Sequence, residues 1–457
     1  MKSPGPSVGI AGLGYMGLAT GVGFAARGCP TVGFDIRAEA RRDLRRGRTS
    51  IREPGLDPLF ARATRTGRFR PVDSWDDLVR ASRVIFLCLP TPRRPSGSID
   101  LRPLLSGVRD LGLALRGVPG RRLVVVKSTV VPGTTANRVR PLLEQVSRRS
   151  RTDLGVASNP EFLAEGSMIR DVLTPERIVI GVDDRRDAAL LRRVYRGFPA
   201  PILELTPSGA ELVKYASNAF LATKVAFVNE ISRLSERIGV EIDPVAEAVG
   251  LDSRIGAKFL VAGPGFGGSC FEKDVRALAS RARELGVRLP LVESLVPTND
   301  AQTHHAFEII RDALGGLRRR RIALLGLSFK SGTDDVRETR ALPIALEALR
   351  GGAEVRVHDP VATRKFLALW KELVGSRLGP PIACNRVTEA LRGADAAVVH
   401  SPWPEYLRFP SSWTGIMRKP LVIDLRRALP PSVRRRPDLR WVGLGSGSSV
   451  GGASEDR

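Results

Sequence analysis

The sequence predicts an α/β protein in which two doubly wound, parallel-sheet halves are joined by a long central helix. Three observations predict this fold class. Short and wholly apolar runs recur in both halves of the chain, as is typical of strands that are buried on both faces of a parallel sheet. A glycine-rich turn follows the first of these runs and leads into a helical pattern. Between the two halves, apolar residues recur at intervals of three and four.

The N-terminal half is expected to begin with a strand, a tight turn and a helix. Residues 8–11 form the first apolar run, and residues 18–27 carry small and apolar side chains at helical spacing. Gly28 is expected to end this helix, and residues 31–34 are expected to form the next strand. Later strands of the same sheet are expected in the runs "RVIFLCLP", "RRLVVVKSTV" and "IVIGV".

The middle of the chain is expected to form one long helix. Its apolar residues keep the helical spacing from about Pro207 to Val249. Ser208 is the expected N-cap, with Glu211 three residues later as its capping-box partner. A helix of this length could span two domains.

The C-terminal half repeats the α/β pattern. A strand and a glycine turn are expected in "RRRRIALLGLSFKSGTDDVRE", and later strands in "AEVRVHDP", "AAVVHS" and "PLVIDL". The glycine- and serine-rich residues 441–457 are expected to be a disordered tail. The domains are therefore expected at residues 1–200, 201–300 and 301–440.

The chain is strongly basic. Its 457 residues contain 72 Lys and Arg against 48 Asp and Glu, which gives a formal net charge of +24. Such a charge is compatible with binding to nucleic acid, to an anionic membrane or to acidic small molecules. The arginines are spread along the whole chain, however, and no aromatic residues interleave the basic runs as a stacking platform would. The pattern favours a solvated arginine-rich surface and disfavours nucleic acid as a partner.

The cysteines and the apolar runs indicate the cellular compartment. Cys29, Cys88, Cys270 and Cys384 are far apart and form no C-x-x-C pair, so no metal site is expected. Four thiols in a chain of this length do not indicate a disulfide framework, which favours a reducing compartment. No apolar run reaches the roughly eighteen residues of a membrane-spanning helix. These features predict a cytoplasmic protein without a membrane partner.

The segment "GLGYMG" predicts a dinucleotide-binding turn of the Rossmann type. Gly12 permits the tight turn, Gly14 lets a pyrophosphate approach the backbone, and Gly17 lets the helix pack closely on the strand. The N-terminus of the helix then faces the phosphates. Asp35 follows the second strand, where a carboxylate binds the ribose 2′-hydroxyl and repels a 2′-phosphate. NAD is therefore favoured over NADP, although the neighbouring Arg37 weakens that preference.

The segment "GPGFGGSCFEKD" places a cysteine at the end of a glycine-rich loop. The other three cysteines are expected to be inert packing residues. Cys270 differs because Lys273 follows it closely, and a neighbouring positive charge favours the nucleophilic thiolate. Asp274 is a candidate base, and the glycines would allow a bulky group to lie against the backbone. The segment predicts that Cys270 is a nucleophile.

Two further clusters have both a structural and a functional interpretation. Glu161 and Glu165 are four residues apart in "SNPEFLAEG" and mark either a solvated helix start or a functional pair. Lys214 and Asn218 are one helical turn apart among apolar residues. A lysine beside an apolar stripe usually extends to solvent, but this pair could instead direct two donors at a developing oxyanion.

Six segments together resemble the UDP-glucose/GDP-mannose dehydrogenase family. They are "GLGYMG", "KSTVVPGTT", "NPEFLAEGS", "ELVKYASNAFLATKVAFVNE", "RIGAKFLVAGPGFGGSCFEKD" and "GLSFKSGTDDVRET", and the match runs from Val8 to about Leu425. The resemblance implies two Rossmann-like domains, the first for NAD and the second for the UDP of the substrate. It also implies a central helical dimerisation region, and therefore a homodimer.

The resemblance further implies a four-electron oxidation of the C6 alcohol of UDP-glucose to the uronic acid, with two NAD molecules used in turn. Cys270 would capture the intermediate aldehyde as a thiohemiacetal, and water would cleave the thioester that forms next. The other implied catalytic residues are Asp274, Thr129 and Glu161, which would position and activate the water, and Lys214 and Asn218, which would stabilise charge on the C6 oxygen.

The implied binding residues come from the same segments. The cofactor contacts would be Gly12, Gly14, Gly17, Asp35, Thr91, Thr129, Glu165, Lys273 and Arg337. The substrate contacts would be Phe162, Leu163, Ala164, Glu165, Lys214, Asn218, Phe259, Leu260, Val261, Ala262, Gly263, Gly267 and Lys330. Arg254 resembles the arginine that reaches the sugar nucleotide across the dimer interface, where a guanidinium suits a phosphate or carboxyl group.

Two alternatives remain open. GDP-mannose as the substrate would share Cys270, Lys214 and the mechanism but would require a purine pocket, and "SCFEKD" and "RIGAKFL" are more similar to the UDP-glucose branch. From another class, a basic nucleic-acid-binding protein with a degenerate Rossmann fold would explain the +24 charge. It would not explain why Cys270, Lys214 and Asn218 occur together.

Overall fold

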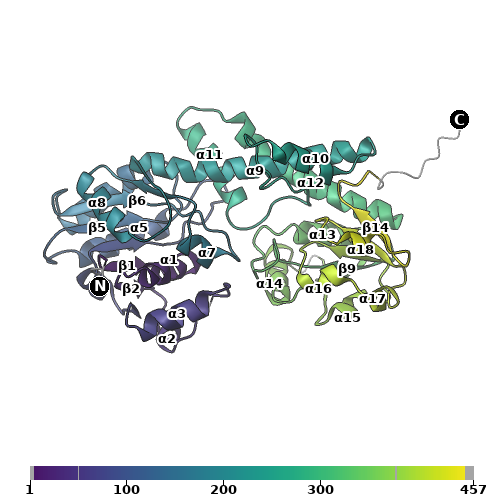
Figure 1. The fold of residues 1–457 in the computed structure, drawn as a ribbon, viewed down its shortest axis with the longest axis horizontal. Helices are drawn as coiled ribbons and strands as arrows, with labels where there is room; N and C mark the ends of the chain where they lie inside the picture. Colours follow the sequence, from purple (N-terminus) through teal and green to yellow (C-terminus); the bar gives the residue numbers. More distant parts are fainter. Residues whose placement is uncertain (1–4, 50, 376–377, 448–457) are drawn as a thin grey trace. The chain divides into compact units, whose positions relative to one another are not determined.

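The computed structural model describes residues 5–49, 51–375 and 378–447, which form two compact units. The first unit comprises Met1–Ser217 and Ser280–Val287, and the second comprises Asn218–Ala279 and Arg288–Arg457. Each unit is built around its own β-sheet (Figure 1).

The sheet of the first unit has eight strands in the order β3-β2-β1-β4-β5-β6-β7-β8. The strands are β1 (Val8–Ala11), β2 (Thr31–Phe34), β3 (Phe69–Pro71), β4 (Val84–Leu87), β5 (Arg122–Val126), β6 (Leu154–Ser158), β7 (Ile178–Gly181) and β8 (Ile202–Leu205). Neighbouring strands are parallel except β6 and β7, which are antiparallel. The order 3-2-1-4-5-6 is that of the dinucleotide-binding fold, in which ligands bind where the order reverses, between β1 and β4.

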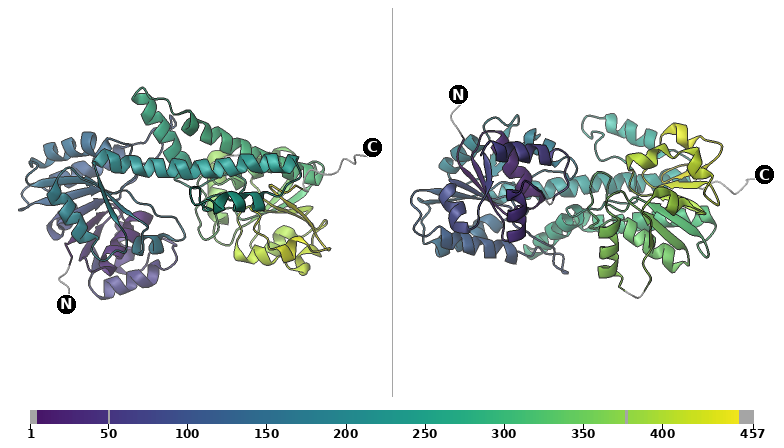
Figure 2. Two further views of the ribbon diagram at one scale, coloured as in Figure 1. Left: turned by 45° about the horizontal axis from the view of Figure 1, so that its top comes forward. Right: turned by 90° about the horizontal axis from the view of Figure 1, so that it is seen from below.

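Helices cover both faces of this sheet (Figure 2). They are α1 (Tyr15–Ala26), α2 (Ala38–Arg45), α3 (Leu56–Arg65), α4 (Trp75–Ala81), α5 (Arg102–Ala114), the π-helix η1 (Thr135–Val139), α6 (Arg140–Ser147), α7 (Met168–Leu173) and α8 (Arg185–Val194). Successive residues of β4 show the consequence: Val84 and Phe86 belong to one apolar core, and Ile85 and Leu87 to the other. Since both faces of the inner part of the sheet are buried, β1 and β4 are continuous apolar runs, as the sequence predicts.

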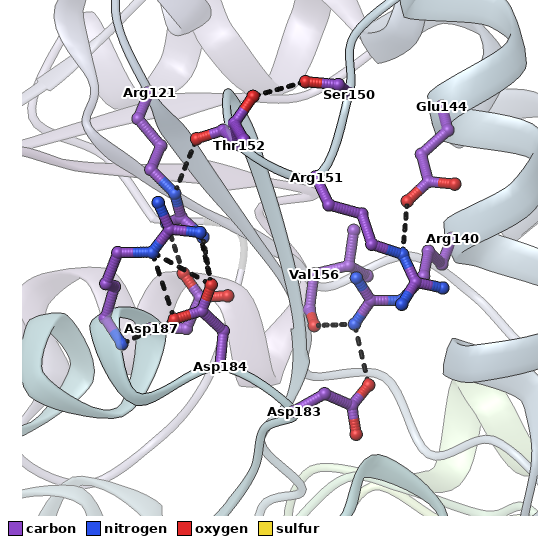
Figure 3. A network of polar contacts seen from close by, with 11 residues as sticks. Arg121, Arg140, Glu144, Ser150, Arg151, Thr152, Val156, Asp183, Asp184 and Asp187 are labelled. Carbon is purple, nitrogen blue, oxygen red and sulfur yellow. Dashed lines mark hydrogen bonds and ion pairs between the residues drawn. The ribbon is translucent and has the colours of Figure 1, made fainter.

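A network of hydrogen bonds and ion pairs links the segments around β6 and α8 (Figure 3). The guanidinium of Arg121 donates to the carbonyl oxygen of Thr152 and pairs with the carboxylates of Asp184 and Asp187. Asp187 is buried, and a side chain at Gly155 would collide with its carboxylate. The glycine in β6 therefore makes room for this buried ion pair.

The predicted long central helix is confirmed, but its predicted extent from Pro207 to Val249 is wrong, because this segment contains two helices. Helix α9 (Pro207–Arg237) ends before Gly239, and α10 (Ile242–Leu251) follows. Gly239 has φ 70°, and the N–H of Val240 donates to the carbonyl oxygen of Ser235. This is the Schellman closure that a glycine favours at a helix C-terminus.

The predicted capping box at the start of α9 is also wrong. The helix begins at Pro207, so Ser208 lies inside it. The carboxylate of Glu211 instead accepts hydrogen bonds from the backbone N–H groups of Gly133 and Thr135, at 2.7 and 2.8 Å. Glu211 therefore fastens the loop after β5 to the first turn of α9.

The sheet of the second unit has six parallel strands in the order β11-β10-β9-β12-β13-β14. The strands are β9 (Arg321–Leu325), β10 (Glu354–His358), β11 (Ile382–Ala383), β12 (Ala396–Val399), β13 (Leu421–Asp424) and β14 (Arg440–Gly443). The same 3-2-1-4-5-6 order recurs, which confirms the predicted fold class of two Rossmann-like halves. The predicted tail at 441–457 begins too early, since β14 contains Trp441–Gly443; residues 448–457 lie outside the described residues.

The remaining helices belong wholly or partly to the second unit. They are α11 (Phe271–Glu284), α12 (Pro290–Leu314), α13 (Ala341–Arg350), α14 (Thr363–Leu373), α15 (Val387–Leu391), α16 (Pro404–Arg408), α17 (Ser411–Thr414) and α18 (Pro431–Arg434). Across the described ranges, no helix has the length and apolar character needed to cross a bilayer.

Candidate active site

The turn between β1 and α1 has the geometry that its glycines predict. Gly12 has φ 92°, and a Cβ there would collide with the carbonyl oxygen of Cys88. A Cβ at Gly17 would collide with the carbonyl oxygen of Gly12. A Cβ at Gly14, by contrast, would meet nothing within 4 Å. Two glycines therefore serve the packing of the turn, and the third leaves open space at the N-terminus of α1, where phosphate binds readily.

Asp35 lies at the end of β2 and its carboxylate is buried. One carboxylate oxygen accepts the backbone N–H of Leu13 at 2.9 Å, and the other accepts the backbone N–H and Nε of Arg37 at 3.0 and 3.1 Å. Burial alone would raise the pKa of Asp35, but the bonds from Arg37 and Leu13 outweigh it and lower the pKa below its ordinary value. Asp35 is therefore ionised at neutral pH and can accept a ribose hydroxyl.

The ends of β4 and β5 bring together two of the predicted cofactor contacts. The hydroxyl of Thr91 donates to the carbonyl oxygen of Thr129 at 2.9 Å. Both residues follow parallel strands at the carboxyl edge of the sheet, beside the point where the strand order reverses. This is the edge where α/β sheets bind ligands.

The loop after β6 brings Glu161 and Lys214 together. Lys214 Nζ lies 2.9 Å from Glu161 Oε1, and the backbone N–H of Leu163 donates to Oε2 at 2.6 Å. Lys214 is buried rather than extended to solvent. Burial would raise the pKa of Glu161, but the positive charge of Lys214 and the bond from Leu163 hold the pKa below its ordinary value.

The helical interpretation of the Glu161 and Glu165 spacing is wrong. Residues 159–164 form no helix, and α7 begins only at Met168. Both oxygens of the buried Glu53 accept backbone N–H groups of this loop, from Gly166 at 2.9 Å and Met168 at 2.7 Å. The segment is therefore a loop that Glu53 holds in place through its backbone N–H groups.

In the second unit, Asn218 and Asp274 form a buried pair. Asn218 Nδ2 donates to Asp274 Oδ2 at 2.6 Å, and Lys273 Nζ lies 2.5 Å from Asp274 Oδ1. Both carboxylate oxygens therefore face donors. Such a carboxylate is suited to orienting its neighbours.

Cys270 stands directly before α11. The backbone N–H of Asp274 donates to the carbonyl oxygen of Cys270 at 2.8 Å, so the thiol belongs to the cap of the helix. A helix N-terminus favours negative charge. The side chain is exposed, whereas Cys29, Cys88 and Cys384 are buried. Burial raises the pKa of Cys29 to about 11 and that of Cys88 to about 12, which keeps those thiols protonated.

The glycines before Cys270 make room for the protein itself, contrary to the expectation that they admit a bulky ligand. A Cβ at Gly265 would lie 2.8 Å from Asn299 Oδ1, and one at Gly268 would lie 2.9 Å from the ring of Phe329. A Cβ at Gly267 would lie 2.5 Å from the carbonyl oxygen of Glu338. The loop therefore has a fixed path, pressed against its own unit.

Helix α12 fastens this loop with polar side chains. Asn299 accepts the N–H of Phe266 at 2.7 Å and donates to its carbonyl oxygen at 2.9 Å. Gln302 Nε2 donates to the carbonyl oxygen of Gly263 at 2.9 Å. In the loop before Cys270, both the N–H and the carbonyl oxygen of Phe266 are therefore hydrogen-bonded.

Three other predicted contacts are paired locally. Arg254 binds Asp252 at 2.6 Å, and Arg337 binds Asp335 at 2.7 Å. Lys330 lies over the ring of Phe329. In the segment 259–262, the side chains alternate: Phe259 and Val261 are exposed, and Leu260 and Ala262 are buried.

The sequence analysis missed two cations at strand ends, the partly buried Arg426 and the buried Lys127. Arg426 follows β13, and its guanidinium donates to the carbonyl oxygens of His400, Phe329 and Gly265 at 3.3 to 3.5 Å. Burial, together with the charge of Arg340, lowers the pKa of Arg426 to about 10. Lys127, the second, follows β5. The available signal was a basic residue directly after a mostly apolar run, in "VVVKST" and "LVIDLRR".

Metal ligands do not gather anywhere in the part of the chain that the structure describes, where no three His, Cys, Asp or Glu side chains lie close enough to hold an ion.

Comparisons with known proteins match this arrangement. Three family models match successive segments: the NAD binding domain of the UDP-glucose/GDP-mannose dehydrogenase family at residues 6–199, its central domain at 208–301 and its UDP binding domain at 323–431.

Individual relatives align with most of the chain. UDP-glucose 6-dehydrogenase TuaD of Bacillus subtilis is 36% identical over 92% of this chain and 88% of its own length. UDP-glucose 6-dehydrogenase AglM of Haloferax volcanii is 37% identical over 95% of this chain and 99% of its own. GDP-mannose 6-dehydrogenase of Pseudomonas putida is 38% identical over 77% of this chain and 80% of its own. The solved structure of a UDP-glucose dehydrogenase from Pyrobaculum islandicum is 38% identical, with a TM-score of 0.89 over 97% of this chain and 99% of that one.

Proposed function

The chain belongs to the UDP-glucose/GDP-mannose dehydrogenase family, and we propose that it is an NAD-dependent UDP-glucose 6-dehydrogenase that makes UDP-glucuronate. The observation that carries the proposal is the exposed thiol of Cys270 in the cap of α11, four residues before the buried carboxylate that holds Asn218. The named relatives support it, because two UDP-glucose 6-dehydrogenases align with nearly the whole chain.

The first unit supports NAD as the cofactor. The space beside Gly14 is open for a pyrophosphate, and Asp35 is an ionised acceptor for a ribose hydroxyl. Thr91 and Thr129 meet at the same edge of the sheet. When bound, NAD takes up a hydride from the C6 carbon of the sugar in each of the two oxidations. The 301–440 domain is assigned to the UDP moiety.

The protein's own groups handle the sugar oxygen and the aldehyde. Lys214 and Asn218 donate hydrogen bonds to the C6 oxygen as negative charge develops on it, and losing one such donor typically costs ~3 kcal/mol of barrier. The Cys270 thiolate then forms a C–S bond to the aldehyde carbon while the oxygen takes up a proton. Loss of the second hydride and of that proton leaves a thioester. The proposal requires these groups to act on one carbon.

Water completes the reaction by cleaving the thioester. It adds to the carbonyl carbon, the C–S bond breaks, and the thiolate is regenerated beside a carboxylic acid, which releases its proton to solvent. Glu161 takes the proton of this water, since its lowered pKa keeps it ionised at neutral pH. Asp274, whose two oxygens face Asn218 and Lys273, orients the water together with Thr129.

Turnover with each candidate sugar tests the substrate. Purified protein is mixed with NAD and, in turn, UDP-glucose, GDP-mannose and a UDP-N-acetylhexosamine, and NADH is followed by absorbance. We expect two NADH per UDP-glucose and much slower reaction with the other sugars. Faster turnover of GDP-mannose would transfer the assignment to the other branch of the family. No turnover with any sugar, together with salt-sensitive binding of DNA, would favour a nucleic-acid-binding protein.

Helix α9 supports a homodimer. Phe220, Phe227 and Leu234 recur every seven residues along it, with exposed fractions of 65%, 49% and 56%. Apolar side chains at this spacing form one stripe on a helix, and such a stripe packs against a second helix. The dimer joins two copies of this stripe. A cytoplasmic location fits a protein with a catalytic thiol and NAD as the oxidant.

A further inference from the structure

Lys127 is a buried lysine at the carboxyl end of β5, and the proposed reaction has no role for it. Its Nζ lies 3.0 Å from Asn159 Oδ1 and 3.4 Å from the carbonyl oxygen of Asn159. Asn159 follows β6, the next parallel strand, and its N–H donates to the carbonyl oxygen of Val126. Lys127 therefore links the first residues of two loops by hydrogen bonds. One loop leads to Thr129 and the other leads to Glu161.

Asn159 is itself held from two other sides. Its Nδ2 donates to the carbonyl oxygen of Val179 at 2.8 Å, and the hydroxyl of Tyr195 donates to its Oδ1 at 2.5 Å. The Oδ1 atom thus receives one charged donor from Lys127 and one neutral donor from Tyr195. These two contacts can be removed separately, which makes their roles separable.

Lys127 also faces the catalytic charges. Burial, with a smaller contribution from the charge of Lys214, lowers the pKa of Lys127 to about 8, and Cys88 and Glu161 oppose the shift. Lys127 in turn lowers the pKa of Glu161, after the larger effects of burial, Lys214 and Leu163. The Glu161 carboxylate therefore interacts with two ammonium groups, and the ion pair is with Lys214.

We propose that Lys127 is a positioning residue that keeps Glu161 ionised beside Lys214 and aligns the two loops that carry Thr129 and Glu161. A carboxylate acts as a base only while it is ionised, and a second cation nearby preserves that state. The positive charge of Lys127 also disfavours the protonated form of Lys214. The proposal rests on the proposed function, because it assigns Lys127 to that reaction.

Three variants separate charge from hydrogen bonding. Lys127→Gln keeps a donor for Asn159 Oδ1 but removes the charge, and Lys127→Arg keeps the charge. Tyr195→Phe is the matched control, since it removes the other donor to Asn159 Oδ1 and changes no charge. For each variant, kcat and KM are measured with UDP-glucose and NAD as a function of pH, and thermal melting confirms the fold.

The sign of the expected shift follows from electrostatics. Removing a positive charge makes it easier for Glu161 and Lys214 to hold a proton, so both limbs of the kcat profile move to higher pH. We expect Lys127→Gln to lose about tenfold in kcat on the acid limb, the loss that accompanies a shift of one pH unit, with KM for NAD unchanged. Lys127→Arg and Tyr195→Phe should keep the acid limb of the wild type.

The outcomes decide between the alternatives. If Lys127→Gln has the same limbs as the wild type, or if Tyr195→Phe moves them equally, Lys127 only supports Asn159 and the proposal is wrong. If Lys127→Gln does not fold, Lys127→Arg decides: a charge that is never lost should move the basic limb to lower pH, and an unmoved limb overturns the proposal. A wild type that makes no NADH from UDP-glucose refutes the proposed function and this role with it.

Discussion

Single residues determine the electrostatics of the site through the donors that surround each carboxylate. Asp35 faces Leu13 and Arg37, and Glu161 faces Leu163 and Lys214. Burial of an isolated carboxyl raises its pKa, but fixed N–H donors and cations reverse the effect. Both groups therefore keep their charge at neutral pH although they lie largely inside the protein.

Replacing Asp35 should weaken NAD binding selectively. Asp35→Ala removes the acceptor for the ribose hydroxyl, and a hydrogen bond to a charged group contributes about 1.5–3 kcal/mol. We expect KM for NAD to rise roughly tenfold to a hundredfold, while KM for UDP-glucose changes little. Steady-state kinetics with each ligand varied in turn measure both constants. An unchanged KM for NAD would remove Asp35 from the cofactor site.

Replacing Glu161 should lower stability in a way that depends on pH. The pKa of Glu161 is lowered in the folded protein from an ordinary value of 4.5. Its charge therefore contributes stability above pH 4.5, and this contribution is lost as the pH falls through the folded-state pKa. Glu161→Gln removes the carboxylate that forms an ion pair with the buried Lys214 and should cost about 3 kcal/mol at pH 7.

Urea unfolding of the two proteins at a series of pH values measures this difference. The cost should shrink as the pH falls below 4.5. Glu347→Gln, at an exposed glutamate paired with Arg350, is the control and should cost less than ~1 kcal/mol. A cost for Glu161→Gln that stays constant down to acid pH would contradict the assigned charge state.

At the residue scale, the sequence indicates candidate residues where their chemistry is local. Cys270 stood out because charged residues follow it within four positions, and it is the exposed cysteine of the four. Lys127 and Arg426 were missed because their significance depends on neighbours that are far away in the chain. Asn159, for instance, is 32 residues from Lys127.

At the scale of elements, the strands follow directly from their apolar runs. The expected strands at 8–11 and 31–34 coincide with β1 and β2. The central helix is shorter than its apolar pattern predicts. Gly239 adopts a left-handed backbone conformation, and α9 ends just before it. Glu211 has a tertiary role that its spacing from Ser208 concealed, since the backbone N–H groups of Gly133 and Thr135 compete for its carboxylate.

The loops before the proposed catalytic groups are held by side chains from other elements. Glu53 fastens the loop after β6, and Asn299 fastens the loop before Cys270. No local pattern indicates such a contact, so the sequence predicts that these loops exist but not which path they take. The role of the glycines before Cys270 could not be predicted from the sequence either. A side chain at two of these positions would collide with Phe329 or Glu338, which are distant in the chain.

Breaking the network between β6 and α8 should destabilise the first unit. Asp187→Ala removes the buried partner of Arg121, whose other carboxylate contact, to Asp184, is longer at 3.5 Å. We expect a loss of about 2–3 kcal/mol in unfolding free energy, as for a partly buried ion pair that loses one member. Chemical denaturation measures it, with Glu347→Ala as the exposed control. A loss no larger than that of the control would mean that this network contributes nothing measurable.

At the scale of the whole molecule, the chain uses one architecture twice. Both sheets have the strand order 3-2-1-4-5-6. In each, the first strand leads to a glycine with positive φ, at Gly12 and Gly326. An aspartate after the second strand accepts an N–H of that turn, Asp35 from Leu13 at 2.9 Å and Asp359 from Leu327 at 2.8 Å.

The oligomeric state provides a prediction at this scale. Phe227→Glu places a charge in the middle of the exposed stripe on α9, where a dimer would have to bury it at a cost of several kcal/mol. We expect light scattering coupled to gel filtration to change from a dimer mass to a monomer mass. Ile382→Glu, at an exposed residue of β11, is the control and should stay dimeric. A Phe227→Glu protein that remains a dimer would place the interface elsewhere.

In the proposed reaction, the Cys270 thiol binds the sugar carbon covalently. Measuring the masses of the cysteine peptides during turnover tests this bond. Protein quenched with acid during turnover of UDP-glucose and NAD is digested, and every cysteine peptide is weighed. Cys29, Cys88 and Cys384 are internal controls because all three are buried, and Cys270→Ser is the negative control. We expect a sugar nucleotide adduct on the Cys270 peptide alone. An adduct on another cysteine, or Cys270→Ser protein that still makes two NADH per sugar at the normal rate, would contradict it.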